Sequence, residues 1–282
     1  VRPAMIVANV FAVTMAPTIY LVVTSLTPLN LTNPMTQGNF HHPLANFVLL
    51  IHDDRFLNSL WVQAKLSFWT VGLQLGIGIG IALLMNLKSG LIQALRTVFL
   101  IPMVLPPIVA ALIWKILYTP DISPLHRALA AMHMPVSSLI TNPDTALWAI
   151  AFADTWEWFP FTMLIILAAL QMVPREPLES AQVDGATRLQ LFWYIELPFI
   201  QPAIVVAALF RLIDSIKAFP LIYVLTDGGP GNATEVTNYY AFQQTFSFSY
   251  WGYGSAVAVL MVAGVFVLSV LVNRLGGEVV DE

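Results

Sequence analysis

The 282-residue sequence contains no cysteine, which excludes disulfide bonds, thiolate nucleophiles and cysteine-ligated metal sites. Charge is also scarce: charged residues make up 10% of the chain, against about 25% in an average soluble domain. A formal net charge of −4 offers no basic surface for nucleic acid. Apolar residues make up 58% of the chain and occur in long runs. Composition therefore predicts an all-α, polytopic membrane protein, with residues 1–282 forming a single transmembrane domain.

Six of these apolar runs are long enough to cross a bilayer, because a helix needs about 20 apolar residues to span the hydrocarbon. They cover approximately residues 4–26, 66–87, 97–118, 145–172, 198–225 and 254–273. The first run is too long for a signal-peptide core and lacks a clear cleavage site, so we interpret it as a retained span. The sequence opens with Val1 rather than Met, and we expect further residues before it.

Lysine and arginine are distributed unevenly between the connecting segments. With the N-terminus inside, the inner segments hold Arg2, Lys88, Arg96, Arg175, Arg188 and Arg274. The outer loops then hold only Arg55 and Arg127. The positive-inside rule therefore predicts that both termini lie in the cytoplasm, together with the polar segment 173–198 between spans 4 and 5.

That polar segment has a helical pattern of its own. A first helix is expected through Glu179 to about Asp184, and Gly185 allows a bend. A second helical piece over 186–195 carries an apolar face, and Leu197-Pro198 is expected to end it at the membrane. The pattern alone is also compatible with a surface helix that lies on lipid headgroups.

The order of residues in this segment resembles the signature loop of ABC-importer permeases: Glu-x-Ala, three residues, Gly, nine residues, then Ile-x-Leu-Pro. Ser180 stands where that family usually has alanine. Similarity to carbohydrate-uptake permeases of the maltose type extends over Arg96–Pro120, Pro174–Ala186 and Thr226–Pro230. In that family the loop is a coupling helix that docks into an ATPase. The resemblance assigns this coupling role to Glu179, Ala181, Asp184, Gly185, Ala186, Ile195, Leu197 and Pro198.

The resemblance implies a non-catalytic subunit in the inner membrane of a prokaryote. Its expected partners are a second permease, two copies of an ATP-binding subunit, an extracytoplasmic solute-binding protein and the surrounding lipid. It would form half of the path for a sugar, by alternating access driven by ATP. The chain has no GxxxxGK[ST] motif and so is not expected to hydrolyse ATP itself. No cofactor is expected, and the scattered histidines show no metal-binding spacing.

Five ionisable residues lie inside the fourth and fifth predicted spans. Span 4 carries Asp154 and Glu157, and span 5 carries Arg211, Asp214 and Lys217, each three residues from the next. A spacing of three places each set on one helical face. An ionisable group at the bilayer centre costs about 2.5–3.5 kcal/mol on insertion scales, so these groups must avoid lipid. Two interpretations stay open: an ion network between helices, or a polar translocation cavity.

The resemblance to maltose-type permeases places sugar contacts in spans 4 and 5. The corresponding positions here are Asp154, Glu157, Trp158, Phe161, Arg211, Asp214, Ser215 and Ala218. Several of them are charged where the family pattern is often neutral, which argues against a plain glucose oligomer. A di- or oligosaccharide derivative, an amino or acidic sugar, a polyol and a glycerophosphodiester are the substrates left open.

A self-contained, ion-coupled transporter is the alternative from another class, with Asp154, Glu157 and Asp214 as proton or cation sites. Six spans with no detectable inverted repeat match that class poorly. Within span 2, Gly76 and Gly80 form a small-xxx-small stripe, which predicts close helix packing at these two positions. In span 3, Pro102, Pro106 and Pro107 predict a kink.

Overall fold

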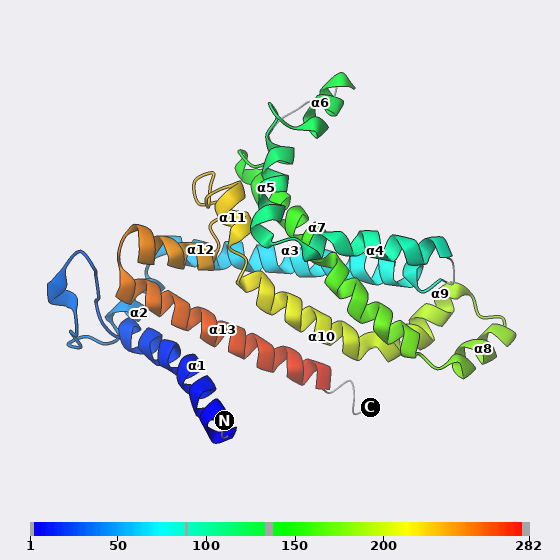
Figure 1. Cartoon of the computed structure of the whole chain (residues 1–282), viewed down its shortest axis with the longest axis horizontal. Helices are drawn as coiled ribbons and strands as arrows, with labels where there is room; N and C mark the ends of the chain where they lie inside the picture. The colour runs from blue at the N-terminus through cyan, green and yellow to red at the C-terminus, as the bar shows by residue number, and fades with distance from the viewer. Residues whose placement is uncertain (1–2, 88–89, 133–137, 278–282) are drawn as a thin grey trace.

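The computed structural model describes residues 3–87, 90–132 and 138–277, and the chain there consists of helices joined by loops (Figure 1). The helices are α1 (Pro3–Ser25), η1 (Pro34–Thr36), α2 (Ala45–Ile51), α3 (Asp54–Met85), α4 (Gly90–Val104), α5 (Pro107–Tyr118), α6 (Pro124–Ala131), α7 (Pro143–Met172), α8 (Arg175–Val183), α9 (Arg188–Leu191), η2 (Phe192–Glu196), α10 (Leu197–Ile216), α11 (Pro220–Leu225), α12 (Thr237–Phe242), η3 (Gln243–Ser247) and α13 (Trp251–Gly277).

Helix α7 is the central element of the bundle. It packs along α3 and also contacts α4, α5, α10 and α11. Of its most apolar window 67% is buried inside the protein, against 22% for the equivalent windows of α3 and α13. Asp154 and Glu157, the charged residues in the middle of α7, are buried and therefore face other helices rather than lipid.

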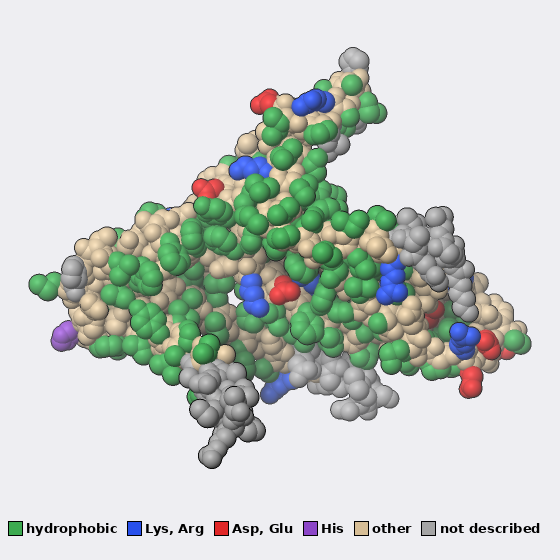
Figure 2. All heavy atoms as spheres, in the orientation of Figure 1, with side chains coloured by type: hydrophobic (Ala, Val, Ile, Leu, Met, Phe, Trp, Pro, Cys, Tyr) green, Lys and Arg blue, Asp and Glu red, His purple; other side chains and the backbone are tan. Residues whose placement is uncertain are grey.

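Four helical segments of the described chain are long and apolar enough to cross a membrane: Asp54–Met85, Pro143–Met172, Arg188–Ile216 and Trp251–Leu271. A fifth results if α4 and α5 are counted as one bent span, and α1 contributes a shorter apolar helix, Val13–Ser25. Hydrophobic side chains cover much of the visible face of the bundle, as lipid contact requires (Figure 2). The chain is therefore a multi-pass membrane protein.

The third predicted span is sharply bent. The bend lies at Pro106-Pro107 and not at Pro102, the other proline expected to kink the helix. Helix α4 continues through Pro102, whereas the chain turns by 101° between Val104 and Pro107. Two consecutive prolines explain the position, because Pro106 has the extended ψ of 137° that a residue before proline favours. Beyond the bend, α5 packs against α7 and α11 and leads to α6 (Figure 1).

The fifth predicted span, 198–225, is not one unbroken helix. Helix α10 ends at Ile216, Lys217 caps it, and a separate helix α11 starts at Pro220. Phe219 adopts φ −122°, ψ −49°, outside the regular helical region, because the following proline disfavours helix at this position.

The expectation that Leu197-Pro198 ends the second cytoplasmic helix is also wrong. The chain stays helical from Arg188 to Ile216 without interruption. A turn of π-helix, Phe192–Glu196, precedes the proline, and Leu197 N donates to Phe192 O, five residues back. This wider turn shifts the hydrogen-bond register and accommodates a proline that would clash with a regular α-helical carbonyl.

The close approach of α3 to α7 occurs at Gly78 rather than at the predicted stripe. A Cβ built on Gly78 would lie 2.7 Å from Thr162 Cγ2, whereas Gly76 and Gly80 have nothing within 4 Å of that position. The prediction for Gly76 and Gly80 is therefore wrong, because the contact face of α3 passes through the glycine between them.

Asp53 joins the start of α3 to α12 and α13. It caps α3 by accepting hydrogen bonds from the backbone amides of Arg55 and Phe56, and it accepts 2.6 Å bonds from the hydroxyls of Tyr240 and Tyr253. Burial raises the pKa of Asp53, but these hydrogen bonds together outweigh burial and the pKa lies below its usual value. Arg55 extends the cluster with a bidentate ion pair to Glu235.

Candidate functional site

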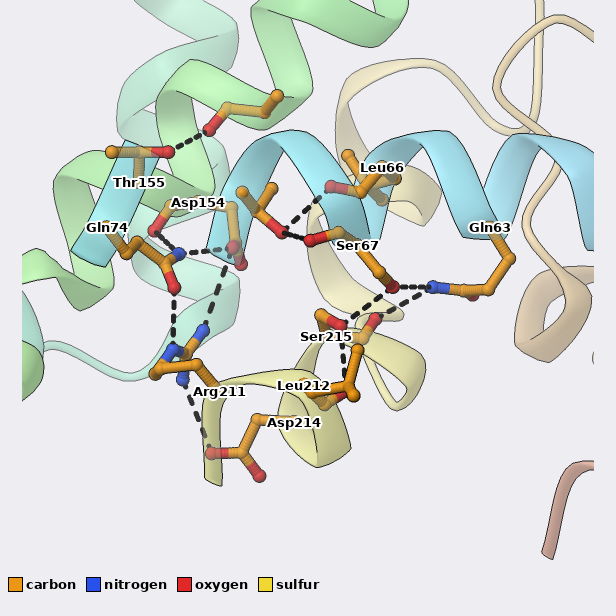
Figure 3. Close-up of polar contacts among 12 residues, drawn as sticks. Gln63, Leu66, Ser67, Gln74, Asp154, Thr155, Arg211, Leu212, Asp214 and Ser215 are labelled. Atoms are coloured by element: carbon orange, nitrogen blue, oxygen red, sulfur yellow. Dashed lines mark hydrogen bonds and ion pairs between the residues drawn. The ribbon is translucent and has the colours of Figure 1, made fainter. Parts of the chain in front are cut away.

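Arg211 of α10 is the centre of a buried polar network (Figure 3). Only 1% of this residue is exposed. Its Nε donates a 2.7 Å hydrogen bond to Gln74 Oε1, and its Nη1 and Nη2 lie 3.3 Å and 3.7 Å from the carboxylates of Asp214 and Asp154. The guanidinium also lies 4.7 Å from the ring centroid of Trp158, within cation–π distance. All the polar edges of Arg211 thus have partners in the protein.

Gln74 links the remaining members of this network. Its Nε2 donates to Asp154 Oδ2 at 2.8 Å and to the Asp154 carbonyl oxygen at 3.2 Å, while its Oε1 accepts from Arg211. The amide therefore bridges α3, α7 and α10 at one point (Figure 3). Breaking a buried pair of this kind is costly because the partner left behind is an uncompensated charge.

A second polar contact joins α3 to α10 nearby. Ser215 Oγ lies 2.8 Å from Ser67 Oγ, and Gln63 Nε2 donates to Ser67 Oγ at 3.0 Å and to the Ser215 carbonyl oxygen at 3.1 Å. Ser215 is 2% exposed, so it is committed to helix packing.

A cavity of about 180 Å³ adjoins the Arg211 network. It is lined by Pro107, Asp154, Glu157, Trp158, Arg211, Asp214, Lys217, Ala218, Pro220 and Leu221. The breaks in the third and fifth spans contribute to it, since Pro107 begins α5 and Pro220 begins α11. Carboxylates, an ammonium group and an indole ring thus line one small space, which suits a ligand that has both hydroxyl groups and an apolar face.

Glu157 is fully buried, and neither of its carboxylate oxygens has a hydrogen-bond partner among the described residues. Lys217 lines the same cavity and forms no ion pair within the described part of the chain. The predicted ion network between spans 4 and 5 is therefore confirmed for Asp154 and Arg211, and the structure does not extend it to Glu157 or Lys217.

Of the eight residues predicted to contact sugar, six line this cavity. Phe161 instead packs edge-to-face on Phe210 with ring centroids 6.2 Å apart, and Ser215 belongs to the serine contact. Sequence reasoning missed the contribution of α3. Its signal is a row of polar residues at spacings of four, three and four within an apolar span, namely Gln63, Ser67, Thr70 and Gln74.

The segment between α7 and α10 forms a projection of two helices at one end of the molecule (Figure 1). Gly185 joins the helices with φ +84°, a conformation that favours glycine, and Ala186 N donates to Ala181 O to close the end of α8. Thr187 and Gln190 form a capping box that starts α9. The predicted helix–bend–helix is therefore confirmed as local structure.

We call this projection, residues 175–196, the coupling projection after its predicted role, and it exposes apolar side chains. Val183 is 88% exposed and Tyr194 is 78% exposed, and no residue of α8 is buried. A hollow of about 300 Å³ between the two helices is lined by Ala181, Asp184, Gly185, Ala186, Gln190, Leu191, Tyr194 and Ile195. Five of the eight predicted coupling residues line this hollow. Glu179 lies elsewhere on exposed α8, Leu197 packs against the core, and Pro198 stands at the start of α10.

The sequence is similar to those of known transport proteins. Residues 74–279 match the family described as binding-protein-dependent transport system inner membrane component. The chain is 32% identical over 233 residues to the trehalose/maltose transport system permease protein of Thermococcus litoralis, covering 83% of this chain and 79% of that one. It is 35% identical over 247 residues to the sulfoquinovosyl glycerol transport system permease protein of Agrobacterium fabrum, covering 88% and 80%.

The fold is also that of a solved transporter. A chain of a bacterial ABC transporter involved in import of the acidic polysaccharide alginate superposes with a TM-score of 0.84 at 21% identity, covering 98% of this chain and 94% of that chain.

Proposed function

The chain belongs to the family of binding-protein-dependent transport system inner membrane components, and from this we propose that it is a permease subunit of an ATP-driven ABC importer for a sugar. The observation that carries the proposal is the exposed coupling projection, which is rooted in the same two helices, α7 and α10, that supply the charged cavity. Such an arrangement can pass movement from a cytoplasmic partner to a ligand site.

The proposed topology has six spans: α1, α3, the bent pair α4–α5, α7, the continuous helix Arg188–Ile216, and α13. Both termini lie in the cytoplasm, and residues 1–282 act as one transmembrane domain. Arg96, Arg175, Arg188 and Arg274 then lie on the cytoplasmic side, in agreement with the positive-inside rule.

The proposed substrate is an oligosaccharide or a sugar derivative. Relatives are named for trehalose and maltose, for sulfoquinovosyl glycerol and for arabinooligosaccharides. In this chain, Asp154, Glu157 and Asp214 would accept hydrogen bonds from hydroxyl groups, and Trp158 would offer an apolar face to a sugar ring. The chain provides half of the path, and a second permease would complete it.

The remaining partners are two copies of an ATP-binding subunit below the membrane and a solute-binding protein outside it. Residues Ala181, Asp184, Gly185, Ala186 and Ile195 would meet the ATP-binding subunit at the hollow of the coupling projection, with Glu179, Leu197 and Pro198 shaping its flanks. ATP hydrolysis would occur in that subunit and not in this chain.

Movement of the coupling projection would reach α7, α10 and α3 together. Asp154, Arg211 and Gln74 join these helices by short polar contacts. Because separating them would expose unpaired charge in a dry environment, we expect the three helices to move as one block. The cavity would then open at the boundary between this block and the second permease.

The energy source of uptake tests the proposed function against an ion-coupled transporter. In cells that express the intact complex, uptake of a labelled sugar should stop when ATP is depleted and continue when a protonophore collapses the proton gradient at constant ATP. Uptake that depends on the proton gradient and does not depend on ATP would contradict the proposal.

A further inference from the structure

A second cavity, of about 840 Å³, lies between the coupling projection and the helical bundle. It is separate from the Arg211 cavity and shares no residue with it. Its charged lining consists of Arg96, Arg175, Arg188, Glu179 and Glu196. Acidic and basic side chains can be seen together at the end of the molecule formed by α8 and α9 (Figure 2).

The three arginines come from three different helices, α4, α8 and α9. All three are exposed, and no ion pair joins any of them to an acidic side chain in the part of the chain that the structure describes. Three arginines against two glutamates leave the lining with one surplus positive charge. This differs from Arg55 and Arg211, which are both neutralised by carboxylates of the same chain.

One wall of this cavity is apolar. Met85 at the end of α3 and Leu170 and Val173 at the end of α7 line it together with the charged groups. Under the proposed topology these helix ends lie at the cytoplasmic surface of the membrane, where phosphate headgroups and the first carbons of acyl chains occur together.

We propose that this cavity binds the phosphate group of an anionic membrane phospholipid. Guanidinium groups recognise phosphate oxygens through paired, charge-assisted hydrogen bonds, and basic pockets between membrane helices on the cytoplasmic side suit anionic headgroups. The apolar wall favours a lipid over a soluble phosphate ester, because a soluble ester has nothing to place against Met85, Leu170 and Val173.

The lipid would also act on coupling. Arg175, Glu179 and Gln182 of α8 line the cavity, and α8 has no fully buried residue: its Leu178 is partly buried against the core. A phosphate held between Arg175 on α8 and Arg96 on α4 would tie the coupling projection to the bundle. Anionic lipid should therefore raise the amount of sugar moved per ATP hydrolysed.

Native mass spectrometry of the intact complex tests the binding step without any transport measurement. The complex is placed in nanodiscs of phosphatidylcholine that contain roughly one-fifth phosphatidylglycerol, and retained phosphatidylglycerol is counted. Wild type should retain it, and the triple variant Arg96→Gln, Arg175→Gln, Arg188→Gln should bind it about tenfold or more weakly. The single variant Arg175→Gln, on exposed α8, should show a smaller loss with the fold intact. Arg274→Gln, an arginine at the end of α13 outside this cavity, should retain wild-type binding.

Three outcomes would overturn the proposal. One is unchanged phosphatidylglycerol retention in the triple variant. Another is displacement of the lipid by millimolar glycerol phosphate in solution, which would identify a soluble phosphate ester as the ligand. The third is loss of the ATP-binding subunit from the triple variant with lipid still bound, which would make the arginines a docking surface for that subunit. Because retention is measured without transport, failure here is distinct from failure of the proposed function.

Discussion

At the scale of single residues, the molecule places its charges in two contrasting environments. Arg211 and Asp154 are almost fully buried and paired, and Gln74 satisfies the remaining polar edges of both. Glu157 is equally buried and lacks a hydrogen-bond partner in the described chain. The first arrangement holds helices together, whereas the second leaves an unpaired carboxyl group beside the cavity, and we propose that this group accepts a hydrogen bond from the ligand.

Removing one member of the buried pair should destabilise the fold strongly. We expect Arg211→Gln to lower the free energy of unfolding by about 3–5 kcal/mol, because Asp154 and Asp214 lose their shared counter-charge. Arg274→Gln, at an exposed arginine, should change it by less than about 0.5 kcal/mol. Thermal unfolding of the purified chain in detergent measures both. The double variant Arg211→Gln, Asp154→Asn should lose less than the sum of the single losses, and strict additivity would show that the two residues are not coupled.

Asp53 should make the start of α3, which is its outer end under the proposed topology, sensitive to acid. Its pKa is lower in the folded protein than in the unfolded chain, since hydrogen bonds from Tyr240, Tyr253 and two backbone amides outweigh burial. This carboxylate therefore stabilises the fold above its unfolded pKa, and the contribution is lost as pH falls through the folded value.

Hydrogen exchange at the outer end of α3 measures this effect. In wild type, protection should fall as the pH is lowered below about 4, and in Asp53→Asn the dependence on pH should be flatter. Asn remains a good helix cap, so the substitution isolates the charge. Asp144→Asn, at an exposed acid in the first turn of α7, should keep the wild-type profile. Equal profiles for all three proteins would exclude Asp53 as the acid-sensitive group.

At the scale of helices, the apolar runs predict where the long helices lie, and the structure agrees to within a few residues for α7 and α13. Helix α3 ends close to the predicted residue 87, but it begins at Asp54, well before the predicted start at residue 66. The interruptions are harder to predict. A continuous hydrophobic segment does not distinguish one straight helix from two helices separated by a break. It therefore did not predict the break at Lys217–Phe219 or the π-helical turn before Pro198. Both depend on how a proline fits the hydrogen-bond register, which is a property of the packed backbone.

The candidate site was also predictable from the sequence only in part. Spacing of three placed Asp154 with Glu157, and Arg211 with Asp214, on common helical faces, and the structure groups all four around one cavity. Helix periodicity predicts which residues share a helical face, but it does not predict which other helix that face contacts. Gln74 was therefore missed, although it contacts both Asp154 and Arg211.

Gly78 gives a direct test of how α3 meets α7. A side chain there would collide with Thr162, so Gly78→Leu should destabilise the protein by about 1–3 kcal/mol through overpacking. Gly76→Leu and Gly80→Leu should be neutral or slightly stabilising, because nothing lies within 4 Å and leucine favours helix more than glycine. Thermal unfolding of the three variants ranks them, and a larger loss at Gly76 than at Gly78 would show that the helix face is misassigned.

A substitution at Gly185 tests whether the coupling projection takes part in transport. We expect Gly185→Asp to reduce sugar uptake by the intact complex at least tenfold, since a charged side chain enters the proposed docking hollow and φ +84° is strained for it by about 1–2 kcal/mol. Gly38→Asp is the matched control, because Gly38 has φ +69° and lies in an exposed loop far along the chain from the projection. Membrane insertion of both variants should be normal. Equal uptake by both would remove the projection from coupling.

At the scale of the whole molecule, the coupling projection and the polar cavity are both connected to α7 and α10. Under the proposed function, the projection would receive movement from a cytoplasmic partner and the cavity would bind a sugar. The chain belongs to a family of inner membrane components of binding-protein-dependent transport systems, and we propose that the ATPase and half of the path belong to other chains. We therefore expect this protein to be a passive permease that works only in an assembly.

Reconstitution into liposomes tests this account most directly. The purified chain alone, and the complete complex with its second permease, ATP-binding subunits and solute-binding protein, are each supplied with a labelled sugar in the presence of ATP. We predict accumulation only with the complete complex, and none with the chain alone under any ion gradient. Accumulation of sugar by the chain alone, driven by a proton or sodium gradient, would contradict the account.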